Sequence, residues 1–249
     1  GGLTYPRLYH RSVRLNLYRE EWVVTLHFLR EMERLNAQLI EVGNMIEVQV
    51  STAFQAVIQL DEAAARRVIR NDIEVDNTEI QMEEECLKLL ALYQPVAGDL
   101  RLIVAALKIN TDLERIGDHA KNIAEAAIGL SAGSSIEIPE SMNAIFRQAR
   151  LMLRKTLLAH VEADRTLAEE VLRMDDGVDS MCRAELPRQI ELIKQHPEYA
   201  DQRLMLLSVC RQLERIGDHA SNIAEDVVYL LSGDIIRHGE NAAVLNASD

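Results

Sequence analysis

The sequence predicts an all-α protein made by tandem duplication of an antiparallel three-helix bundle, with six long helices in total. Thirteen residues from Leu113, LERIGDHAKNIAE, return from Leu213 as LERIGDHASNIAE, and the only difference is Lys121 against Ser221. Gly and Pro are sparse, at 11 and 5 of 249 residues, which suits long helices better than a β-fold with many turns. Apolar residues follow alternating steps of three and four, which is the pattern of helices that bury one face.

The duplication extends beyond this motif. The segment DEAAARRVIRNDIEVD from Asp61 parallels DRTLAEEVLRMDDGVD from Asp164, at a shift of 103 residues. Because the motif itself repeats at a shift of 100, the first copy holds three extra residues, which we place in the turn around 93–99. A change of length in a turn is typical of a duplicated folded unit.

The segments follow from this pattern in chain order. We expect a basic N-terminal extension at 1–22, a first three-helix bundle at 23–130, a linker at 131–140, a second three-helix bundle at 141–232 and a C-terminal tail at 233–249. Asp61 offers a capping carboxylate for the second helix, and Pro95 with Gly98 ends it. In the fifth helix, Gly177 and Pro187 predict a kink or a weakened turn.

Composition limits the possible partners and location. The net charge of −13 argues against a nucleic-acid partner and permits cation binding. The cysteines show no metal-finger spacing and no disulfide framework, so we expect buried thiols in a reducing cytosol; they are Cys86, Cys182 and Cys210. No window approaches 18 consecutive apolar residues. We therefore expect a cytoplasmic protein.

Acidic pairs with one-turn spacing recur in both copies, on the second helix and again in the repeated motif. The candidate metal ligands are Asp72, Asp76, Glu114 and Asp118 in the first copy and Asp175, Asp179, Glu214 and Asp218 in the second, with Asn122 and Asn222 as possible additions. Residues four apart lie on one helix face, and these two helices run antiparallel, so the pairs could face each other across a groove.

Like charges at this spacing destabilise a helix by roughly 0.2–0.5 kcal/mol per pair, so we expect something to offset them. A hard cation would do so, since carboxylates with no thiolate nearby in the sequence suit Mg, Mn, Fe or Ca better than a structural zinc site. The alternative is an exposed acidic face that basic residues neutralise. Arg115 and Arg215 stand next to the acids, and the other candidates are Arg66, Arg67, Arg101 and Lys108. Spacing alone leaves both interpretations open.

The histidines of the motif, His119 and His219, follow their aspartates by one residue and so point about 100° away. We expect them at the surface or at an interface instead of on a metal. Gly117 and Gly217 lie inside strong helices, where they would allow close helix approach or leave room beside the carboxylates.

The motif and its surroundings resemble the PhoU family of phosphate-signalling regulators. The phrase QPVAGDLRLIVAALKINTDLERIGD at 94–118 is similar to the family's first repeat, and the resemblance covers roughly residues 27–237. It implies a cytoplasmic protein, partly peripheral to the membrane, that couples the phosphate ABC transporter to a sensor histidine kinase and restrains the phosphate-starvation response. It also implies multinuclear metal at the acidic motifs, with Fe, Mn, Mg or Zn as candidate ions, and it is compatible with a homodimer.

The functional hypothesis is therefore a regulator that acts by protein contact and is not an enzyme. A carboxylate-bridged di-iron enzyme is the rival from another class, and such sites need Glu-x-x-His pairs. The residue three positions before each of the seven histidines is never acidic. A purely structural helical scaffold is the third possibility.

Overall fold

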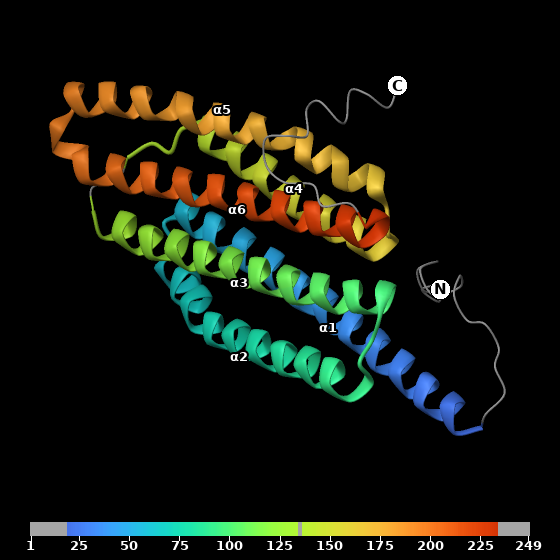
Figure 1. The fold of residues 1–249 in the computed structure, drawn as a ribbon. Coiled ribbons are helices and arrows are strands. Elements are labelled where there is room, and N and C mark those ends of the chain that lie inside the picture. Colours follow the sequence, from blue (N-terminus) through green and yellow to red (C-terminus); the bar gives the residue numbers. More distant parts are fainter. Residues whose placement is uncertain (1–18, 134–135, 234–249) are drawn as a thin grey trace, which may run out of the picture.

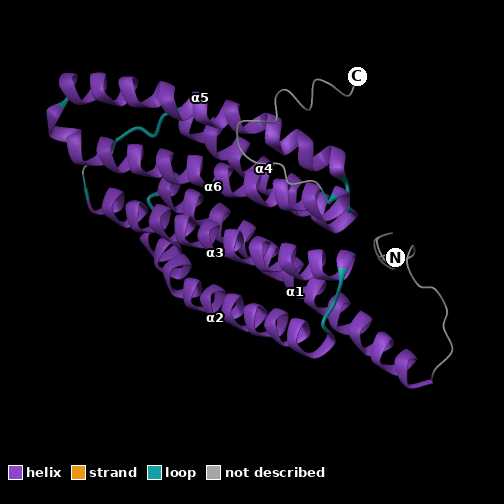
Figure 2. Cartoon of the chain, in the orientation of Figure 1, coloured by secondary structure: helices purple, strands orange, loops and turns teal. Residues whose placement is uncertain are grey.

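The computed structural model describes residues 19–133 and 136–233, and within them the chain is helical, with no strand (Figure 1 and Figure 2). The helices are α1 (Arg19–Gln59), α2 (Glu62–Tyr93), α3 (Ala97–Ala132), α4 (Glu140–Glu162), α5 (Arg165–Gln195) and α6 (Ala200–Ser232), with a 3-10 turn, η2 (Pro197–Tyr199), before α6. This confirms the all-α prediction. Most of the expected extension, residues 1–18, and nearly all of the expected tail, 234–249, lie outside the described residues.

Three segment boundaries differ from those expected, and the smallest difference is at α4, which begins at Glu140 instead of residue 141. Helix α1 begins at Arg19 instead of residue 23, so it includes the last four residues of the expected N-terminal extension. Helix α3 continues through Gly129 to Ala132, two residues into the expected linker, so this single glycine weakens the helix without ending it. The connection between α3 and α4 is therefore shorter than the sequence suggested.

An aspartate at the equivalent position caps the second helix of each bundle. Asp61 accepts a hydrogen bond from the backbone N–H of Ala64 at 2.9 Å, as the sequence predicts. Its counterpart Asp164 accepts from the backbone N–H groups of Thr166 and Leu167 at 2.8 and 3.2 Å. The start of each duplicated unit is thus fixed by one side chain that satisfies otherwise unpaired helix donors.

Helix α5 runs as one helix through Gly177 and Pro187. The proline lacks the N–H that would continue the backbone ladder, so one hydrogen bond of this helix is not made. Gly177 has no atom within 4 Å of the place where a Cβ would stand. Neither residue ends the helix, because the turns on both sides of each residue are helical.

Replacing Gly177 by Ala is expected to stabilise the protein by about 0.5–1 kcal/mol, because Ala loses less conformational entropy than Gly in a helix interior and meets no neighbour here. Urea unfolding of the two proteins measures the difference. Gly43→Ala is a suitable contrast, since a Cβ there would stand 2.6 Å from Cδ2 of Leu157, and we expect it to destabilise. Equal effects of the two substitutions would contradict this description of α5.

The two bundles share one hydrophobic core. Helices α3 and α6 lie side by side along the middle of the molecule, with α1 and α2 on one side and α4 and α5 on the other (Figure 1). Helix α1 also contacts α4, where the rings of Phe54 and Phe146 stack with centroids 4.1 Å apart. The buried apolar residues of both bundles form a single cluster. The duplicated halves are therefore packed as one unit.

The junction between α3 and α6 repeats its contacts with the pseudo-symmetry of the duplication. His119 Nδ1 lies 2.7 Å from Oε1 of Gln212, and His219 Nδ1 lies 2.7 Å from Oδ1 of Asp112, the residue equivalent to Gln212. The two imidazole rings are 5.3 Å apart. The motif histidines are thus interface residues. On each motif helix, the acids lie on a different face from the histidine.

Candidate functional site

The predicted acids of the first copy lie on α2 and α3, and a lysine lies among them; the face that carries these acids is called the first groove below, and its counterpart on α5 and α6 the second groove. Asp72, on α2, has a side chain that is only 2% exposed, and its Oδ2 accepts a hydrogen bond from Nζ of Lys121, on α3, at 2.6 Å. The hydrogen bond to Asp72 raises the pKa of Lys121; burial opposes this, and the charges of Asp72, Asp118 and Asp76 add to it. A lysine therefore lies where three of the predicted metal ligands meet.

The other oxygen of Asp72 points toward the interior. Asp72 Oδ1 is buried and has no hydrogen-bond partner among the described residues. It lies 3.9 Å from the place of a Cβ on Gly117, which would also stand 3.0 Å from Cδ1 of Ile46. Gly117 therefore allows the close approach of α1, which is one of its two expected roles, whereas a Cβ would meet the Asp72 carboxylate only at an ordinary contact distance.

The remaining acids of the first groove repel one another. Burial raises the pKa of Glu114, and the charges of Asp118, Asp76 and Glu79 add to the effect, while Arg115 opposes it. Burial followed by the charge of Asp72 likewise raises the pKa of Asp76. The structure thus brings acids of α2 and α3 into one electrostatic group, as the sequence predicts. Glu79 belongs to this group and was not among the predicted residues.

The second groove, formed by the acids of α5 and α6, has an arginine at the position equivalent to Arg115, which lies 3.8 Å from Asp118 in the first copy, but it has no counterpart of Lys121. Burial and then the charges of Asp179 and Asp218 raise the pKa of Glu214. The neighbouring cations are exposed arginines: Arg183 lies 3.9 Å from Asp179 Oδ2, and Arg215 lies 3.5 Å from Asp218 Oδ2. Ion pairs between exposed groups at such distances contribute little to stability. These guanidinium groups reach the groove from its rim.

Position 221 marks the difference between the grooves. Ser221 replaces Lys121 in the second motif, and its side chain is 1% exposed. Its hydroxyl oxygen is buried without a hydrogen-bond partner among the described residues. A buried hydroxyl in this condition costs free energy unless something satisfies it.

Two of the expected neutralising residues were wrong, whereas Arg115 and Arg215 do approach the acids, at 3.8 Å from Asp118 and 3.5 Å from Asp218. Arg66 pairs with Glu62 of its own helix at 2.6 Å, and Lys108 pairs with Asp226 across the junction with α6. Arg66 and Lys108 therefore do not neutralise the predicted metal ligands. The residue that neutralises Asp72 was overlooked, although it is the one position at which the two motifs differ. Because a lysine side chain is long, it reaches the facing helix from a position adjacent to the acids.

The predicted metal ligands lie on two different faces of the motif helices α3 and α6. Asn122 and Asn222 donate across the junction, to Gln212 Oε1 at 3.3 Å and to Asp112 Oδ1 at 3.1 Å, so the structure places these amides at the α3–α6 interface. Within residues 19–133 and 136–233, no three acidic, His or Cys side chains converge closely enough to hold an ion. The oxygen donors suit a hard cation, and the second groove adds the buried Ser221 hydroxyl.

Two thiols that sequence spacing did not assign to a site lie at one end of the second groove. Cys182 and Cys210 line, with Glu214, a cavity of about 420 Å³, and Cys182 Sγ lies 3.5 Å from the carbonyl oxygen of Cys210. Cys182 follows Asp179 by three residues and Cys210 precedes Glu214 by four, so helical spacing was an available signal. The contact with Cys210 and burial raise the pKa of the Cys182 thiol far above its usual range, which makes it a weak nucleophile.

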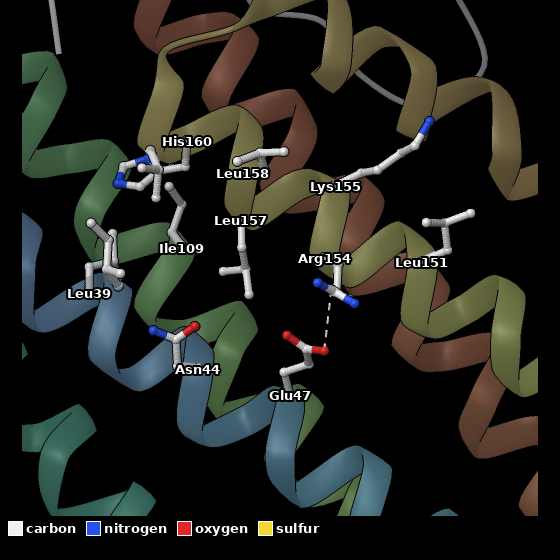
Figure 3. A pocket seen from close by; sticks show the side chains of 12 residues that line it. Leu39, Asn44, Glu47, Ile109, Leu151, Arg154, Lys155, Leu157, Leu158 and His160 are labelled. Atoms are coloured by element: carbon white, nitrogen blue, oxygen red, sulfur yellow. Dashed lines mark ion pairs between the residues drawn. The ribbon is translucent and has the colours of Figure 1, made fainter. Parts of the chain in front are cut away.

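A second cavity lies away from the acidic grooves, between α1, α3 and α4 (Figure 3). Its volume is about 370 Å³, and Leu39, Ile109 and Leu157 are among the apolar residues that line it. Of the polar residues that line it, Arg154 has its Nε 3.4 Å from Glu47 Oε1 (Figure 3), whereas Nδ1 of His160 is buried without a partner among the described residues. This cavity is a largely apolar space at the junction of the bundles.

Comparison with known families assigns both halves of the chain to one domain type. The PhoU domain matches residues 39–127 and again residues 142–227. These ranges correspond to the two bundles and contain all eight of the acids predicted as metal ligands. The chain belongs to the PhoU family. The resemblance seen in the sequence is thereby confirmed, and the duplicated motif is a feature of two tandem PhoU domains.

Curated relatives and solved structures agree with this assignment. A phosphate-specific transport system accessory protein PhoU homolog of Pseudomonas putida is 37% identical over 216 residues, covering 86% of this chain and 84% of the relative. The crystal structure of PhoU from Pseudomonas aeruginosa has a TM-score of 0.81 at 36% identity, covering 83% of this chain and 100% of that one. The crystal structure of the phosphate transport system regulatory protein PhoU from Streptococcus pneumoniae has a TM-score of 0.79 at 27% identity, covering 84% and 99%.

The described helices give no sign of a membrane span. None of them combines the length and apolar character needed to cross a bilayer.

Proposed function

We propose that this PhoU-family protein regulates phosphate uptake and phosphate-starvation signalling through protein contact between the phosphate ABC transporter and a sensor histidine kinase. The observation that carries the proposal is the duplicated acidic groove, retained in both bundles of a chain whose relatives are named as accessory proteins of phosphate transport. The protein would work at the cytoplasmic face of the membrane, attached there through its partners.

Metal binding is the second part of the proposal. The residues that would hold metal are the eight acids, four in each bundle: Asp72, Asp76, Glu114 and Asp118, then Asp175, Asp179, Glu214 and Asp218. A bound cation would neutralise carboxylates whose charges repel one another. The chain's own residues would then present a surface of fixed shape to a partner, since the acids of facing helices would be held together.

No catalytic role is part of this proposal. The thiol of Cys182 is buried with a raised pKa, and the motif histidines form contacts of the bundle junction. The rival di-iron enzyme needs Glu-x-x-His pairs, which this sequence does not contain. The net charge of −13 favours basic protein surfaces over nucleic acid as partners.

Complementation tests this function. The chain is expressed in a bacterium that lacks its own PhoU protein and carries a reporter of phosphate-starvation genes. We expect the wild type to restore repression at high phosphate. A variant with Glu114 and Glu214 changed to Gln and with Asp118 and Asp218 changed to Asn should fold but fail to repress. Full reporter activity with well-expressed wild-type protein would contradict the proposal.

A further inference from the structure

Gln49 is a polar residue at a core position of α1. Apolar residues follow steps of three and four along this helix, and Gln49 occupies the one position where the series is interrupted. The residue is only 6% exposed, and its Oε1 is buried without a hydrogen-bond partner among the described residues. A buried amide oxygen in this condition costs free energy, so its presence calls for a group that satisfies it.

The second bundle shows that the fold does not require a glutamine at this position. The shift of 103 residues that relates the second helices of the two bundles also relates Gln49 to Met152. Met152 is fully buried. An apolar side chain therefore fills the position in one copy, and the polar group in the other copy serves no need of the shared fold.

Gln49 lines an open cavity of about 570 Å³ between α1 and α2, two helices that lie side by side in Figure 1. Glu41 on α1 and Glu74 on α2 line the same cavity, and neither forms an ion pair with another residue that the structure describes. The side chains of Asn44 and Asn71 add two further carboxamides. The remaining lining residues, Ala37, Ile40, Met45 and Val48, are apolar. We call this space the α1–α2 cavity.

We propose that the α1–α2 cavity binds an arginine side chain presented by a basic segment of a partner protein. The inference rests on the protein-contact part of the proposed function, and it specifies a contact surface and the chemistry that this surface recognises. The surface is separate from the predicted metal ligands. Asn71 and Glu74 share one face of α2, whereas Asp72 and Asp76 lie on another, because successive helical residues are about 100° apart.

The lining groups match a guanidinium better than an ammonium. The cavity offers two carboxylates and three carboxamide oxygens, and Oε1 of Gln49 requires a donor. A guanidinium has five N–H donors in a fixed plane and pairs with carboxylates through two hydrogen bonds at once, whereas an ammonium is a compact charge with three donors. It is also the side chain that would satisfy several of these acceptors together.

The apolar part of the lining suits a protein segment instead of a free cation. Met45 and Val48 lie beside the polar groups, and Val48 is 65% exposed. The aliphatic stem of an arginine covers such a surface while its charged end reaches the carboxylates. The net charge of −13 attracts a basic segment from a distance.

Capped tripeptides test the recognition of arginine. A leucine-arginine-leucine peptide, its lysine analogue and its neutral citrulline analogue are titrated into the full chain with isotope-labelled methionine methyl groups. The nuclear magnetic resonance signal of Met45, identified by its loss in Met45→Leu, reports on the cavity. We expect a saturable shift with the arginine peptide and about tenfold weaker binding of the citrulline peptide, which lacks the charge-assisted hydrogen bonds.

Variants of the lining locate the binding site. Glu41→Gln with Glu74→Gln should weaken binding of the arginine peptide about tenfold or more, and Gln49→Met should weaken it while the protein stays folded. Glu33→Gln with Glu84→Gln is the matched control, since it removes the same charge from exposed positions of the same two helices outside the cavity. This control should bind as the wild type does. Circular dichroism verifies that each variant is helical.

The inference is overturned if the wild type does not bind the arginine peptide, or if Glu41→Gln with Glu74→Gln keeps the wild-type affinity. It is also overturned if the lysine peptide or spermidine binds as tightly, because the cavity would then be a general site for cations.

The repression reporter separates this inference from the proposed function. Glu41→Gln with Glu74→Gln is expected to lose repression at high phosphate, and Glu33→Gln with Glu84→Gln to retain it. Full repression by a variant that no longer binds the peptide would overturn the inference and leave the proposed function intact. A wild type that binds the peptide but does not repress would contradict the proposed function instead.

Discussion

Replacing Lys121 by Met is expected to destabilise the protein by about 3 kcal/mol, because it leaves the buried Asp72 carboxylate without its charged partner. Removing one member of a buried ion pair typically costs 3–5 kcal/mol. We expect the lower end, since the Lys121 side chain is 35% exposed and water reaches the ammonium. Urea unfolding at pH 7 without divalent cations measures the change.

Two controls make this result specific. Lys88→Met removes an exposed pair with Glu85, 3.3 Å apart, and should change stability by less than about 1 kcal/mol. Adding Asp72→Asn to Lys121→Met should recover part of the loss, since the buried charge is gone. A loss of similar size at both lysines, or no recovery in the double variant, would show that the Lys121–Asp72 pair does not have the role described.

Acidification from pH 6.5 to pH 4 is expected to lower the free energy of unfolding by about 3 kcal/mol, because of the buried side chain of His160. Burial lowers the pKa of His160 from 6.5 to about 4, while the unfolded chain keeps the ordinary value. Between these values the unfolded state binds a proton that the folded state excludes, so unfolding becomes easier as pH falls. Nε2 of His160 donates to Oδ1 of Asn36 at 2.8 Å, and Nδ1 is buried without a partner among the described residues.

The duplication provides the matched variant for this prediction. The residue equivalent to His160 in the first bundle is Val57, which is fully buried, so His160→Val has a tolerated precedent in the same fold. The free energy of unfolding of both proteins is measured from pH 7 to pH 4. Carboxyl groups with raised pKa, such as Glu114 and Asp226, shift stability in the opposite sense in both proteins and cancel in the difference. Parallel pH curves would contradict the prediction.

Most of the fold could be predicted from the sequence because several independent features of the sequence favoured the same structure. The helical period, the repeated capping aspartates Asp61 and Asp164, and the low glycine and proline content all favoured the same six helices. The packing of the two bundles was not accessible. It depends on contacts such as the stack of Phe54 on Phe146, and one-dimensional periodicity does not say which outer faces meet.

The site was accessible only in part, for a similar reason. Spacing identified acids on facing helices, and the pKa shifts of Glu114 and Glu214 agree with acids gathered in two groups. Spacing did not find Lys121, because its role depends on the reach of a flexible side chain across a groove. The sequence correctly predicted buried thiols, but the proximity of Cys182 and Cys210 was missed because they lie far apart in the sequence, although their helical offsets from Asp179 and Glu214 were visible.

The most direct test of the account is the metal content of tag-free protein purified without chelator, beside a variant in which Glu114, Asp118, Glu214 and Asp218 are neutralised. Elemental analysis of both proteins, loaded with Mn, Fe or Mg, gives the equivalents bound. The account predicts metal in the wild type and its loss in a variant that remains folded. Equal metal content in the two proteins, or none in the wild type after loading, would contradict it and make the acids a docking face for a basic partner.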